Sequence, residues 1–147
     1  MKLWQRVLIS TILAVATIVL LFILYPDGFD TFRSIHFILF TVLLTYTAVF
    51  GIPLGGAKVA LVPLAALSSL IVMGPFASSL AIIISDILYA VVRHYFGEKV
   101  GWYGRQTGFS LATATGANIT MHVLSLIAAG AVYNALDTRV PIENAQQ

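Results

Sequence analysis

Residues 59–92 read VALVPLAALSSLIVMGPFASSLAIIISDILYAVV, two apolar runs separated by Gly74-Pro75-Phe76. Proline lacks a backbone N–H and prevents an ordinary uninterrupted helix, whereas glycine permits a tight turn. A single helix of this length would measure about 51 Å, far more than a hydrocarbon core of about 30 Å. The pattern predicts a helical hairpin with spans at 59–73 and 77–92. A re-entrant hairpin, which enters and leaves the bilayer on one side, is the alternative.

The rest of the chain is equally apolar. Of the 147 residues, 59% are hydrophobic and only 10% are charged, and the mean hydropathy is +0.95. This balance excludes a soluble domain, which needs a polar surface to cover its core. Three further apolar runs predict spans at 7–25, 35–52 and 109–133. We therefore expect an all-α integral membrane bundle of about five transmembrane helices, forming one domain over 1–133 with a polar tail at 134–147.

The basic residues predict the orientation of this bundle. With five spans, six lie on the side of the N-terminus and two on the other, which places the N-terminus in the cytoplasm. The six are Lys2, Arg6, Lys58, Arg93, Lys99 and Arg105. Cations and aromatic rings suit the headgroup layer. The expected interface anchors are Lys58, Arg93, Trp102, Tyr103 and Arg105.

Asp86 is the most unusual residue, because it lies about 10 Å along the helix from the interfacial Arg93 and so well within the bilayer. An ionised carboxylate there must find a partner, be protonated or face the bundle interior. Tyr89 and Arg93 share its helix face at spacings of three and seven. Asp86 is therefore either a packing contact or part of a ligand, ion or proton site.

A polar stripe marks the last span, where Thr115, Asn118, His122 and Ser125 recur at spacings of three and four. Hydrogen bonds between helices are one interpretation. The other pairs His122 with Asp86 across two helices, since both fall near the middle of their spans. The candidates for a ligand or proton site are thus Asp86, His122, Asn118 and Tyr89.

Small residues on the same span predict close helix contacts. Gly116 stands four residues from both Ala112 and Thr120, a spacing that lets another backbone approach. The expected packing residues are Thr115, Gly116, Thr120 and Ser125.

No catalytic signature is present, and we expect no enzyme activity and no cofactor. The sequence contains no cysteine, no phosphate loop and no His and carboxylate group at metal spacing, so no metal site is expected. The basic residues are scattered singly, which argues against nucleic acid as a partner.

The order of motifs over residues 50–136 resembles the membrane-embedded N-terminal sensor regions of bacterial HD-GYP phosphodiesterases and diguanylate cyclases. The motifs are Pro53-Leu54-Gly55-Gly56, Gly74-Pro75, a basic aromatic loop, and a helix that opens at Phe109 and ends in Ala128-Ala129-Gly130-Ala131-Val132-Tyr133. Ser110 stands where that family usually has Asn. The resemblance implies a bacterial inner membrane and a sensory or anchoring role for a cytoplasmic signalling output, which in that family follows further spans.

The middle region also resembles the substrate-binding subunits of energy-coupling-factor transporters, which often show a Gly-Pro turn and then a Ser-Asp pair like Ser85-Asp86. Three functions are therefore expected in this order: a sensory or anchoring membrane module, a small-molecule-binding transporter subunit, and a structural accessory subunit of a larger membrane complex. The expected partners are the lipid bilayer and another membrane or signalling protein, or a second copy of the chain.

Overall fold

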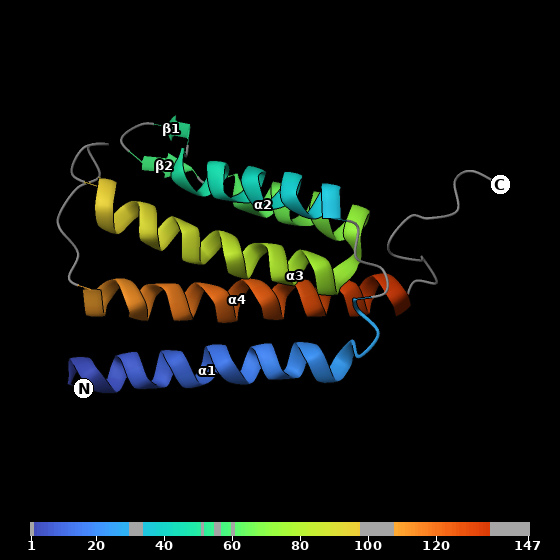
Figure 1. The fold of residues 1–147 in the computed structure, drawn as a ribbon, viewed down its shortest axis with the longest axis horizontal. Helices are drawn as coiled ribbons and strands as arrows, with labels where there is room; N and C mark the ends of the chain where they lie inside the picture. Colours follow the sequence, from blue (N-terminus) through green and yellow to red (C-terminus); the bar gives the residue numbers. More distant parts are fainter. Residues whose placement is uncertain are drawn as a thin grey trace.

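The computed structural model describes residues 2–29, 34–50, 52–54, 57–59, 61–97 and 108–135. Helices dominate, and Figure 1 shows them stacked with their axes roughly aligned. In chain order the elements are α1 (Leu3–Leu24), α2 (Ser34–Val49), β1 (Ile52–Leu54), β2 (Ala57–Val59), α3 (Val62–Phe96) and α4 (Gly108–Ala135).

Three of the helices are long and apolar enough to cross a membrane. They are α1, α3 and α4, with 22, 35 and 28 residues. Helix α2 has 16 residues, fewer than the roughly 20 that a span needs. The all-α membrane class predicted from the sequence is thus supported. The prediction of five transmembrane helices is wrong, because the described residues form four helices.

The predicted span at 35–52 ends early, and the span at 59–73 begins late. Helix α2 stops at Val49 and α3 starts at Val62, because the chain between them forms a small antiparallel hairpin of β1 and β2. In its register Ile52 pairs with Val59 and Leu54 with Ala57. Proline also disfavours the helical conformation at the residue before it, which is Ile52. These strands were not predicted.

The other boundaries shift by a few residues. Helix α3 continues to Phe96 rather than ending at 92, and α4 runs from Gly108 to Ala135. Arg93 therefore lies on the last turn of α3 and not in a loop. Of Lys58 only the backbone is described, in β2. The predicted anchors Trp102, Tyr103 and Arg105, and residues 136–147 of the predicted tail, lie outside the described residues.

Helix α3 is broken at Gly74, where the sequence predicted a hairpin. Gly74 has φ 77° and ψ 172°, whereas the residues on both sides are helical. This backbone region is almost exclusive to glycine. Pro75 then opens the second half, a position where its fixed φ suits a helix start. In Figure 1 the ribbon turns back here, so that residues 62–73 run beside α2 and residues 75–96 lie between them and α4.

The contacts of α4 require this reversal. A Cβ atom built on Gly116 would lie 3.0 Å from the Ser10 carbonyl oxygen, and one built on Gly130 would lie 3.3 Å from Tyr25 Oη. The later residue of α4 thus lies beside the later residue of the α1 segment, so α1 and α4 are parallel. If α3 did not reverse at Gly74, then α2, α3 and α4 would each run opposite to the helix before it, and α4 would be antiparallel to α1.

The second half of α3 forms the centre of the bundle. Residues 75–79 are buried without interruption, and Ile82 is almost fully enclosed. Helices α1 and α4 are buried on one side only, and apolar side chains such as Ile12 and Met121 are exposed. In a membrane, lipid would cover this surface.

Candidate functional site

Asp86, near the middle of the second half of α3, meets His122, near the middle of α4. His122 Nδ1 lies 3.1 Å from Asp86 Oδ2. The Asp86 side chain is 7% exposed and the His122 side chain 23%. The structure thus brings together the two residues that the sequence offered as a pair across helices.

This contact satisfies the carboxylate in an apolar interior. Nδ1–H of His122 donates to Asp86, and the contact becomes an ion pair when the imidazole is protonated. Burying a carboxylate without such a partner is costly, and removing one member of a buried pair leaves the other uncompensated. The pair therefore joins α3 to α4 at a position where water does not readily take the place of either hydrogen-bonding partner.

Tyr89 and Arg93 pair with each other. Arg93 Nη1 donates to Tyr89 Oη at 3.1 Å, and the guanidinium carbon lies 5.9 Å from the ring centroid. Asn118 is half-buried one turn before His122. These residues form what we call the polar seam, which leads from mid-bundle to the end where α3 finishes: Asp86, Tyr89, Arg93, Asn118 and His122.

The hydroxyls of the predicted polar stripe donate within α4. Thr115 donates to the Leu111 carbonyl at 2.9 Å and Ser125 to the Met121 carbonyl at 2.7 Å, within α4 itself. Thr120 likewise donates to Gly116. These three hydroxyls donate within their own helix because a carbonyl one turn back is within reach of a helical Ser or Thr. Ser125 is also exposed rather than inward-facing.

Glycines of α4 mark both of its close helix contacts. Gly116 lies against Ser10 of α1, as the small-residue spacing predicted. Gly130 was not predicted to be a contact, but a Cβ added to it would lie 2.9 Å from Pro75 Cβ. Its position within a run of alanines could have indicated a close contact with another helix.

Two further polar groups were missed. Ser78 and Ser79 are fully buried just after the break in α3, and their hydroxyls have no hydrogen-bond partner among the described residues. They directly follow Pro75-Phe76-Ala77. A pair of serines just after the proline that starts a helix could have indicated buried hydroxyls at this point.

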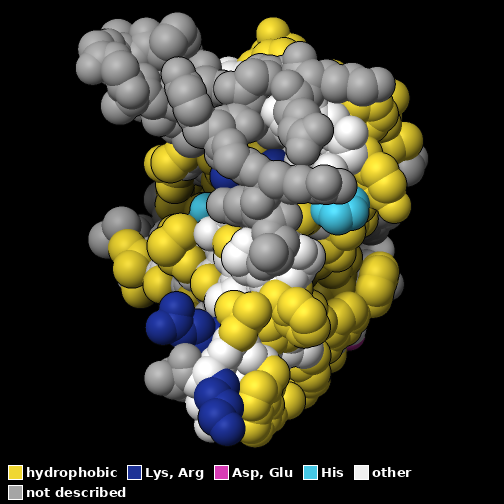
Figure 2. All heavy atoms as spheres, turned by 90° about the vertical axis from the view of Figure 1, so that its left-hand side faces the viewer, with side chains coloured by type: hydrophobic (Ala, Val, Ile, Leu, Met, Phe, Trp, Pro, Cys, Tyr) yellow, Lys and Arg dark blue, Asp and Glu magenta, His cyan; other side chains and the backbone are white. Residues whose placement is uncertain are grey.

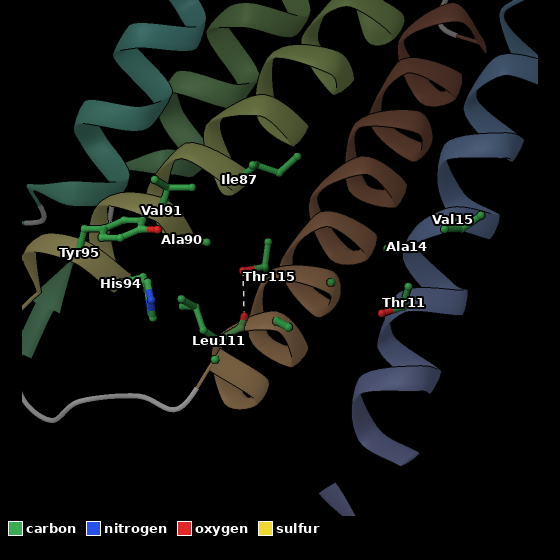
Figure 3. Close-up of a pocket in the computed structure, with 13 residues that line it drawn as sticks. Thr11, Ala14, Val15, Ile87, Ala90, Val91, His94, Tyr95, Leu111 and Thr115 are labelled. Atoms are coloured by element: carbon green, nitrogen blue, oxygen red, sulfur yellow. Dashed lines mark hydrogen bonds between the residues drawn. The ribbon is translucent and has the colours of Figure 1, made fainter. Parts of the chain in front are cut away.

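A groove of about 570 Å³ lies over the first turns of α4, between α1 and the last turns of α3. Figure 3 shows His94 and Tyr95 at one side of it, with Thr11 and Val15 of α1 facing them. The seam residues do not line this groove.

A smaller cavity of about 270 Å³ lies at the opposite end, beside the break in α3. Tyr25, Asp27, Gly74, Pro75 and Asn134 are among the residues that line it. Burial raises the pKa of Tyr25 above its usual range.

Comparison of the chain with protein-family models, curated proteins and solved structures finds no match. The resemblance to bacterial sensor regions therefore rests on the order of sequence motifs alone.

Proposed function

We propose that this chain is a non-catalytic membrane module with a sensory role, which acts on a signalling output through the packing of α3 against α4. The observation that carries the proposal is the Asp86–His122 contact at 3.1 Å in mid-bundle. Ionisable residues inside a membrane bundle are costly, and they commonly mark functional positions.

The contact is suited to a switch because it is a single side-chain hydrogen bond between two helices. Forming or losing a charge-assisted hydrogen bond changes the preference between two packings of the same helices. Helix α4 also contacts α1 at Gly116 and α3 at Gly130. A shift of α4 would thus change contacts at both ends of the bundle.

We further propose that Lys2 and Tyr95 lie on the cytoplasmic side and that Asp27 and Asn134 lie on the other side. The chain contains no cysteine, so each position can be replaced singly by cysteine and labelled with an impermeant maleimide in intact cells. All four side chains are exposed in the structure. We expect Asp27→Cys and Asn134→Cys to react from outside and Lys2→Cys and Tyr95→Cys only after permeabilisation. Tyr95→Cys and Asn134→Cys reacting from the same side would contradict this topology.

The sensory role predicts that weakening the pair changes how α3 and α4 pack. Spin labels at Ile87→Cys and Leu124→Cys, both exposed positions, report the distance between the helices in nanodiscs. We expect one distance population in the wild type and a second, longer one in Asp86→Asn, because a neutral amide accepts a weaker hydrogen bond than a carboxylate. Ser125→Ala is the control, since its hydroxyl donates to the Met121 carbonyl within α4. An identical distribution in Asp86→Asn would count against the switch and leave a purely structural role.

A second candidate function, a small-molecule-binding transporter subunit, has one observation in its favour. Interrupted membrane helices often lie at substrate sites, and the cavity beside Gly74 adjoins the interruption in α3. This function predicts a thermal shift of the protein with one vitamin-like compound, lost when Asn134→Leu fills the cavity.

A further inference from the structure

The groove between α1 and α3 has an apolar inner part. Helices α1 and α3 touch each other little, and both pack against α4, which forms the floor. Ala14, Ile87, Ala90, Val91 and Ala112 line this part. Because their side chains are small or aliphatic, the space between the helices remains open and suits a flexible hydrocarbon chain.

The groove opens toward the basic end of the bundle. His94 and Tyr95 lie at this end, and Arg93 directly precedes them on the last turn of α3. Figure 2 views this end and shows Lys, Arg and His side chains on it. The described acidic residues are elsewhere, since Asp27 lies at the opposite end beside Gly74 and Asp86 is paired with His122.

We propose that this groove binds an anionic phospholipid of the surrounding membrane. One acyl chain lies along Ala90 and Ala112, and the phosphate lies at the end where His94 and Tyr95 line the groove, with Arg93 beside them on the last turn of α3. The charge of this end complements an anionic headgroup, and aromatic residues such as Tyr95 suit the headgroup layer.

Native mass spectrometry of the full chain, with phosphatidylglycerol or phosphatidylcholine of identical acyl chains, tests the site. Phosphatidylglycerol should be retained preferentially. Ala112→Leu places a larger side chain in the groove and should lower retention about tenfold, as expected for displacing one or two buried methylenes. Ala128→Leu, the same change at an exposed position of α4, should leave retention unchanged.

A second variant tests the contribution of the lipid headgroup to binding. Arg93→Gln with His94→Gln should reduce the preference for phosphatidylglycerol by roughly fivefold or more, the effect of removing one basic residue near an anionic lipid. Equal retention of both lipids, or no effect of Ala112→Leu, would overturn the proposal. So would retention of glycerol phosphate without acyl chains, which indicates a phosphate site only, or an Ala112→Leu-sensitive dimer without lipid, which indicates a second copy in the groove.

Discussion

Replacing Gly74 by alanine should lower the free energy of unfolding by about 2–3 kcal/mol, at the upper end of the range for a strained backbone position. Gly74 has φ 77° and ψ 172°, where a Cβ atom collides with the backbone. Relieving that strain would alter the reversal of α3 and shift Pro75 away from Gly130, which it contacts closely. The change is measured by steric trapping, which monitors the unfolding of the protein in bicelles.

Gly108→Ala is the matched control for this prediction. Gly108 begins α4, and no heavy atom would lie within 4 Å of its added Cβ. This variant should be as stable as the wild type or slightly more so, because alanine favours a helix. If Gly74→Ala and Gly108→Ala were equally stable, α3 would not reverse at Gly74.

Asp86→Ala should destabilise the bundle by about 1–2 kcal/mol. Breaking a deeply buried ion pair in a soluble protein costs roughly 3–5 kcal/mol. Polar contacts between membrane helices average only about 0.6 kcal/mol and reach about 1.7 kcal/mol. The partial exposure of His122 places this pair nearer the membrane values. Ser125→Ala should change the free energy by less than about 0.5 kcal/mol, measured in the same way.

Local signals predicted the long apolar helices and the break within α3. A proline after a glycine interrupts a helix wherever it stands, so Gly74-Pro75 was readable without tertiary information. The end of α2 was not readable, because it depends on the pairing of Ile52 with Val59. Such pairing forms between two segments, and neither segment alone alternates clearly enough to indicate a strand.

The site could be predicted only in part. A carboxylate in the middle of a span needs a partner. The chain offers few polar residues at that depth that could partner Asp86, and His122 is one of them. Which candidate meets it depends on the rotation of α4 against α3, which the sequence does not encode locally. The donations of Thr115 and Ser125 within α4 show that hydroxyls have a competing acceptor in their own helix. The approach of Gly130 to Pro75 joins residues far apart in the chain.

The coupling free energy between Asp86 and His122 tests the central claim most directly. It is obtained from a double-mutant cycle of Asp86→Ala and His122→Ala in bicelles, with Asp86→Ala and Ser125→Ala as the control cycle. The 3.1 Å contact predicts a coupling of about 1–2 kcal/mol for the pair and none for the control. Additive effects in both cycles would contradict the contact and, with it, the proposed switch between α3 and α4.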